Sequence, residues 1–132
     1  MIPVQIIDYL KRNDVPFVVR RHDRAVDGQR LAAALHVSGY RVAKSVILRA
    51  GGTQWIAVLP AAAMVDAQRL VRELRAERVE LMPEAEFESI FTGCEVGAEP
   101  PFGGLYGMPV VVDPSLTRFS ELVFRAGSHV ES

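Results

Sequence analysis

Apolar residues recur along the chain with two periods, one typical of helices and one typical of strands. Ile2, Ile6, Ile7 and Leu10 follow helical spacing, whereas residues 41–49 (RVAKSVILR) have the apolar, β-rich character of a strand. On this basis the sequence predicts helices at 3–13, 29–36 and 83–90, and an amphipathic helix after Asp66 with Leu70, Val71 and Leu74 on its inner face. It predicts strands at 15–21, 41–49, 54–59, 79–82, 109–113 and 122–125.

Turn and cap residues separate these elements. The Ala50-Gly51-Gly52-Thr53 segment predicts a hairpin between the second and third strands. Asp27 and Asp66 stand where helix N-caps are expected, and residues 92–108 form a long loop rich in glycine and proline. Helices interleave with hairpin-like strand pairs and do not follow a strict βαβ repeat. The predicted fold is therefore α+β with a mixed sheet.

Composition narrows the class of protein. A chain of 132 residues with 49% hydrophobic and 23% charged residues is typical of one globular domain. The longest apolar run, 56–65, is too short to span a membrane, and the N-terminus does not resemble a secretory signal. The single cysteine, Cys94, excludes an intrachain disulfide and favours a reducing, cytoplasmic location. A net charge of −1 excludes binding to nucleic acid by bulk positive charge.

Lysine usage singles out one candidate for chemistry. Of the 15 basic residues 13 are arginine, and the two lysines are Lys11, on the polar side of the first helix, and Lys44. Lys44 lies within an apolar strand, and it shares one face of that strand with Val42, Val46 and Leu48. Ionised lysines are rarely buried without a partner. Lys44 therefore either lines a cleft or extends from the edge of a sheet.

The loop at 97–104 (GAEPPFGG) is a second candidate, because long glycine-rich loops in compact domains are often functional. It matches neither a phosphate-binding GxxxxGK[ST] loop nor a dinucleotide fingerprint. On composition alone, a wide turn between a helix and a strand is the simpler interpretation.

A third candidate is the Gly127-Ser128-His129 segment, which places a hydroxyl beside an imidazole. No spacing marks a Ser-His-Asp triad, and a polar turn is the simpler interpretation of these three residues. One cysteine and three scattered histidines form no metal-ligand pattern, so we expect neither a metal nor a cofactor.

Taken together, these segments resemble the YbaK/ProX family of aminoacyl-tRNA deacylases, which is related to the editing domain inserted in bacterial prolyl-tRNA synthetases. The strand lysine combined with the GxxxP motif at Gly97–Pro101 and the following Phe102-Gly103 makes the resemblance specific. It extends over nearly the whole chain, through residues 21–22, 42–48, 56–61, 97–104, 107–113 and 126–129.

The resemblance implies a compact α+β domain with a mixed, curved sheet flanked by helices. It implies hydrolysis of the ester that links a wrong amino acid to the 3′-terminal adenosine of tRNA. The family's catalytic lysine matches Lys44. Substrate-binding positions match Gly97, Pro101, Phe102 and Gly103 in the loop, and Gly127, Ser128 and His129 in the late turn. The implied partners are the acceptor end of a mischarged tRNA and an aminoacyl-tRNA synthetase.

Two features depart from the family pattern. The net charge of −1 is poorly suited to gripping a whole tRNA, so we expect contacts confined to the acceptor end, helped by the arginines of 20–24 or 69–78. Relatives usually continue past the position of Ser132, so residues 1–132 are either a short member or a domain cut from a longer protein. The alternative function is a non-catalytic, regulatory module that binds tRNA or another ligand.

Overall fold

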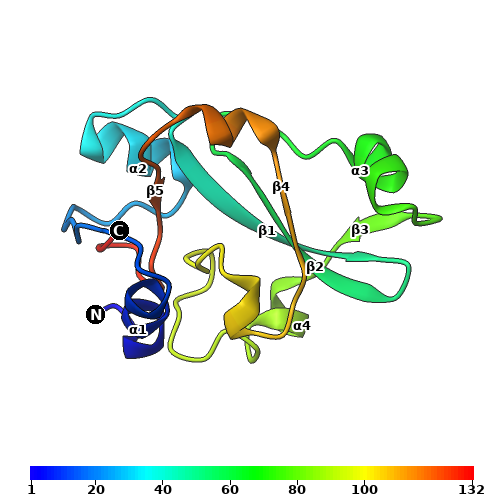
Figure 1. Cartoon of the computed structure of the whole chain (residues 1–132), viewed down its shortest axis with the longest axis horizontal. Coiled ribbons are helices and arrows are strands. Elements are labelled where there is room, and N and C mark those ends of the chain that lie inside the picture. Colours follow the sequence, from blue (N-terminus) through cyan, green and yellow to red (C-terminus); the bar gives the residue numbers. More distant parts are fainter.

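A computed structural model describes all residues, 1–132. Five strands form one curved sheet, and four α-helices surround it (Figure 1). The helices are α1 (Val4–Arg12), α2 (Gly28–Leu35), α3 (Ala67–Leu74) and α4 (Glu84–Phe87). The strands are β1 (Val42–Ala50), β2 (Thr53–Pro60), β3 (Val79–Leu81), β4 (Val110–Val112) and β5 (Val123–Phe124). Short 3₁₀ helices span Gly103–Leu105 and Pro114–Arg118.

The sheet is mixed and is built around β1. Its strand order is β3-β1-β2-β4, and β5 pairs with the remaining part of β1. β1 runs antiparallel to β2 and β3, whereas the β1–β5 and β2–β4 pairs are parallel. Ala50 pairs with Thr53 across the two-residue Gly51-Gly52 turn, which confirms the predicted hairpin. The α+β class with a mixed sheet is thus confirmed.

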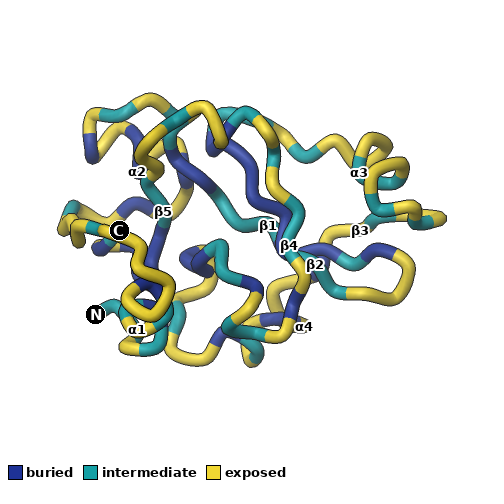
Figure 2. The backbone as a smooth tube through the Cα atoms, in the orientation of Figure 1, coloured by how far each residue is buried: buried dark blue, intermediate teal, exposed yellow.

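Side-chain alternation along β1 produces two apolar faces. Ala43 and Ile47 pack on one face with Ile56, Phe91 and buried residues of the later chain. On the other face, Val42 packs beneath α2, and Leu48 and Ala50 pack beneath α3. Both central strands are accordingly buried over much of their length (Figure 2). Lys44 lies on the same face as Val42 and Leu48, between the parts covered by the two helices.

Helix α2 is positioned by its first turn. The Asp27 carboxylate accepts a hydrogen bond from the Arg30 amide at 2.8 Å, which confirms the predicted N-cap. Gly28 is buried directly against Ala61 and Val42, so the start of the helix rests on the sheet beside Lys44. Asp66 caps α3 in the same way, through the Arg69 amide at 3.1 Å.

Two predicted elements differ from the structure. The strand predicted at 15–21 is wrong: only Arg21 forms a β-bridge, with Glu131, and Val15, Val18 and Val19 are exposed. The segment lies along the C-terminal residues instead of a sheet strand, so its β-propensity has no apolar face to pack against. The helix predicted at 83–90 is regular only over Glu84–Phe87. None of the α-helices combines the length and the apolar character that a membrane-spanning helix requires.

Candidate functional site

Lys44 projects from β1 toward the segment that follows β2. Its Nζ donates hydrogen bonds to the Ala63 carbonyl at 2.6 Å and the Ala61 carbonyl at 3.5 Å. No carboxylate forms an ion pair with it. Partial burial lowers the pKa of Lys44, because desolvation disfavours the charged ammonium. An ammonium has three N–H donors, so one remains available for a ligand.

His129 lies against the first residue of the GxxxP loop. A Cβ at Gly97 would come within 3.3 Å of His129 Cε1. Gly97 also has φ +87, a backbone conformation that L side chains rarely adopt, so both the space and the conformation require glycine here. The loop and the late turn are therefore packed together as one unit.

Hydrogen bonding places one proton of the His129 ring. Its Nε2 lies 2.7 Å from the Val96 carbonyl, which can only accept a hydrogen bond, so Nε2 carries the proton. Nδ1 is enclosed and has no hydrogen-bond partner. His129 is 4% exposed, so it contributes an enclosed ring nitrogen without a hydrogen-bond partner to the wall of this unit.

Two carboxylates accept backbone hydrogen bonds within this unit, and their pKa values are shifted in opposite directions. Glu95 accepts the His129 amide hydrogen at 2.8 Å, and this bond lowers the pKa of Glu95. Glu99, at the centre of the GxxxP motif, accepts the Gly97 amide hydrogen at 3.2 Å and is 8% exposed. Burial raises the pKa of Glu99, since desolvation disfavours its ionised form more than its hydrogen bonds favour it.

The remaining predicted binding residues serve mainly as packing in this conformation. Phe102 lies between Tyr9 and Phe124, with ring centroids 5.3 and 5.0 Å away, and a Cβ at Gly103 would collide with the Met108 carbonyl. Pro101 is half-buried beside Phe102. Their roles toward substrate stay predictions.

The late turn is also ordered internally. The Gly127 amide donates to the Ala98 carbonyl at 2.8 Å, and the Ser128 hydroxyl accepts the Val130 amide hydrogen at 3.1 Å. The structure thus joins the two glycine-containing segments that sequence analysis had kept apart.

Lys44 and the loop unit are brought near each other by residues 25–28. On the loop side, the Ala25 amide donates to the His129 carbonyl at 2.9 Å, and a Cβ at Gly97 would lie 3.9 Å from the Val26 oxygen. On the lysine side, Gly28 packs on Ala61. No hydrogen bond joins Lys44 to the loop directly.

Two buried charged residues of this region, Glu99 and Arg125, were not predicted as site residues from the sequence. Arg125 is 7% exposed and donates two hydrogen bonds to the Ala25 carbonyl, from Nε at 3.2 Å and from Nη2 at 2.9 Å. For Arg125 the only sequence signal was a charged residue at the end of the strand predicted at 122–125. No group of three or more His, Cys, Asp and Glu side chains is arranged to hold a metal ion.

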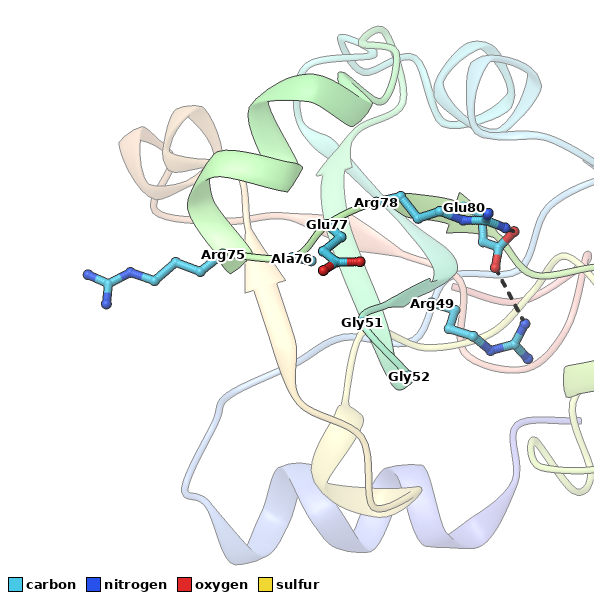
Figure 3. Close-up of a pocket in the computed structure, with 8 residues that line it drawn as sticks. All are labelled: Arg49, Gly51, Gly52, Arg75, Ala76, Glu77, Arg78 and Glu80. Carbon is cyan, nitrogen blue, oxygen red and sulfur yellow. Dashed lines mark hydrogen bonds and ion pairs between the residues drawn. The ribbon is translucent and has the colours of Figure 1, made fainter.

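A surface pocket of about 490 Å³ lies elsewhere, between the β1–β2 turn and the residues that follow α3 (Figure 3). Its charged walls are largely paired: Glu80 contacts Arg78 at 2.9 Å and Arg49 at 4.0 Å, and Arg49 also contacts Glu86 at 2.8 Å. Arg75 points away from the other side chains. This pocket lies toward the opposite end of β1 from Lys44. Its side chains form ion pairs, and none of them is a candidate nucleophile or acid–base pair.

The family profile described as the aminoacyl-tRNA editing domain matches residues 22–132, which include Lys44, the loop and the late turn. The chain belongs to the aminoacyl-tRNA editing domain family. The YbaK/ProX resemblance found in the sequence is thereby confirmed. No curated protein gives a significant sequence match.

Solved structures share the fold of this editing domain. "Hypothetical protein APE2540" superposes with a TM-score of 0.84 at 19% identity, covering 96% of this chain and 85% of that one. A protein described as "a putative trans-editing enzyme for prolyl tRNA synthetase" gives 0.78 at 17% identity, covering 96% and 82%. A scaffold protein from computational epitope grafting gives 0.81 at 16% identity, covering 97% and 81%. At these identities the likeness establishes the fold.

The Glu99→Gln variant of the editing domain tests the desolvated carboxylate. Below the usual pKa of glutamate, wild type and variant should be equally stable. As pH rises through the window between that pKa and the raised folded-state pKa, the wild type must ionise a buried group, and the variant should become the more stable protein. Chemical unfolding from pH 4 to pH 8 measures the difference.

The matched control for this titration is Glu95→Gln, which should behave oppositely. The pKa of Glu95 is lowered in the folded state, so its contribution is present at neutral pH and is lost as pH falls through the folded pKa. The same sign of pH dependence for both variants would contradict this assignment.

Gly97→Ala should lower both the thermal stability of the fold and the deacylation activity that the family resemblance implies. An alanine held at this positive φ destabilises the fold by about 1–2 kcal/mol, and its Cβ also displaces the His129 ring. Gly107→Ala is the control, because Gly107 has φ +67 but a Cβ there would contact nothing within 4 Å. Thermal unfolding should show a loss in both variants, with the larger loss in Gly97→Ala. If the two variants lose equal thermal stability and Gly97→Ala keeps its deacylation activity, the loop is only a connection between a helix and a strand.

Proposed function

We propose that this editing domain is a trans-acting aminoacyl-tRNA deacylase, which hydrolyses the ester between a wrongly attached amino acid and the 3′-terminal ribose of tRNA. Membership of the editing-domain family supports the substrate class. The observation that carries the hydrolytic role is Lys44: it stands in an apolar strand, has no carboxylate partner, and keeps one N–H donor free.

The reaction needs a polarised carbonyl and a water molecule. Water attacks the ester carbonyl carbon, the C–O bond to the ribose breaks, and the water proton passes to the departing ribose oxygen. The products are the free amino acid and a tRNA with an intact 3′ terminus. The Lys44 ammonium stabilises the oxyanion that develops on the carbonyl oxygen, and a ribose hydroxyl of the substrate orients the water.

No protein nucleophile is required for this route. Cys94 is the only thiol, and burial raises its pKa, which disfavours the reactive thiolate. Its Sγ lies 3.7 Å from the Tyr106 hydroxyl, and burial raises the pKa of that tyrosine as well. Tyr106 therefore cannot serve as the base that a covalent mechanism needs.

A regulatory module that binds tRNA without hydrolysis is the second candidate. The 2.6 Å bond from Lys44 to the Ala63 carbonyl favours it, because a lysine held by the backbone can serve a structural purpose. Kinetic and binding measurements separate the two functions.

Lys44→Ala should abolish deacylation across a panel of mischarged tRNAs, with a loss of at least about 10²-fold, the magnitude typical of removing one oxyanion donor. Lys44→Arg should not restore the rate, because a planar guanidinium does not superimpose on an ammonium. Lys11→Ala, at the exposed lysine of α1, is the control and should retain the wild-type rate. A Lys44→Ala variant that is fully active would disprove the catalytic role.

Binding of uncharged tRNA across a salt series gives an independent measure. An enzyme that contacts only the acceptor end neutralises few phosphates, so its affinity should be weak and the salt slope shallow. A dedicated binder should show a steep slope, about −0.9 per phosphate contacted on duplex. A steep slope without hydrolysis of any mischarged tRNA would favour the regulatory module.

A further inference from the structure

Arg125 is a buried guanidinium that lacks a carboxylate partner. It takes part in none of the ion pairs of the protein, and burial lowers its pKa. Asp27 and Glu99 are near enough to attract it, but neither lies within 4.0 Å of it. Burying an unpaired charge is costly, so such a residue is expected to have a role beyond packing.

One edge of the Arg125 guanidinium remains free. Nε and Nη2 both donate to the Ala25 carbonyl, which fixes the plane of the group. Nη1 makes no hydrogen bond with the protein. It is also not enclosed, since the only enclosed side-chain nitrogen and oxygen atoms without partners are Ser45 Oγ and His129 Nδ1. Nη1 therefore keeps some exposure to solvent, although the Arg125 side chain is otherwise buried.

The sheet register places Arg125 beside Lys44. β5 pairs in parallel with β1 through Val42–Val123 and Ala43–Phe124, so Lys44 and Arg125 each directly follow the last of these paired residues. Val42 and Val123 pack in the same cluster beneath α2. Phe124 and Ala126 pack together elsewhere, so alternation directs Arg125 to the face of Val42 and Lys44.

The two head groups diverge around the start of α2. Lys44 turns to the carbonyls of Ala61 and Ala63, whereas Arg125 turns to that of Ala25. Ala25 and Ala61 belong to the same apolar cluster, so the two cations stand at the rim of one group of residues. Each keeps at least one donor that the protein does not use.

We propose that Arg125 binds the phosphate of the terminal nucleotide of tRNA, while Lys44 meets the ester on the same nucleotide. This proposal rests on the deacylase function proposed above. The phosphate is the anionic group nearest to the ester in such a substrate, and the two groups stand on opposite sides of one ribose. A guanidinium whose plane is already fixed suits phosphate oxygens, which accept its N–H donors directionally.

The test uses the whole chain and two simple probes, adenosine and adenosine 5′-monophosphate (AMP), which differ only in the phosphate. Calorimetry should show that AMP binds wild type more tightly than adenosine does. Arg125→Gln should remove that preference and leave adenosine binding unchanged, because glutamine can still donate to the Ala25 carbonyl. Arg12→Gln, at an exposed and unpaired arginine of α1, is the control and should retain the preference.

Deacylation kinetics complete the test. In Arg125→Gln, KM for mischarged tRNA should rise about 10-fold or more, as expected when a hydrogen bond to a charged group is lost, with kcat changed much less. Arg125→Lys, which keeps the charge but not the planar fork, should fall between wild type and Arg125→Gln. Unfolding midpoints of the variants identify any loss of fold.

The outcomes separate this proposal from the general function. An unchanged KM in a folded Arg125→Gln variant would overturn the phosphate contact while leaving the deacylase intact. Loss of AMP binding with an unchanged KM would likewise overturn it and indicate a site for free nucleotides. If wild type hydrolyses no mischarged tRNA, the deacylase function fails, whether or not AMP binds through Arg125.

Discussion

Hydrogen bonding of β1 to three other strands is the constraint on which the rest of the molecule depends. β2 pairs with nearly all of β1, from Ala43 to Ala50, whereas β3 pairs with the last residues of β1 and β5 with the first ones. Its side chains alternate between two apolar faces. Once Val42 and Leu48 are buried beneath α2 and α3, Lys44 must share their face. The position of the candidate catalytic group follows from packing on either side of it.

Charge desolvation then distinguishes the site from the rest of the surface. Most arginines of the protein are exposed, and several pair with nearby carboxylates, as around the pocket of Figure 3. Lys44 and Arg125 instead donate to backbone carbonyls, which orient the side chains without neutralising them. A cation in a fixed position with a free N–H donor can stabilise an anionic group, or a negative charge that develops during reaction, with little rearrangement of its own side chain.

The GxxxP loop and the late turn contribute rigidity to this arrangement. Gly97 leaves room for the His129 ring, and Glu95 accepts the His129 amide hydrogen, so the turn is both packed against and hydrogen-bonded to the segment that carries the loop. Residues 25–28 connect this unit to the lysine side through Ala25 and Gly28. Five separate parts of the chain thus form the site on the sheet: residues 25–28, β1 with Lys44, residues 61–63, the loop at 97–104 and the turn at 125–129.

Local signals in the sequence determined the hairpin, the N-caps at Asp27 and Asp66, the shared face of Val42 and Lys44, and the α+β class. Each of these depends on neighbours within a few residues, through turn chemistry, capping or strand alternation. The motif at Lys44 and Gly97–Pro101 likewise determined the family. The strand predicted at 15–21 failed because β-propensity does not specify a partner, and the available partner was the C-terminal segment.

Only the tertiary structure decided what surrounds the motif residues. The contact of Gly97 with His129 joins residues 32 positions apart, and the bond from Arg125 to Ala25 spans 100 positions. Burial of Glu99 and Arg125 depends on all the segments that close around them. Desolvation is a property of that enclosure, so a sequence shows which residues can carry charge but not which of them the fold removes from water.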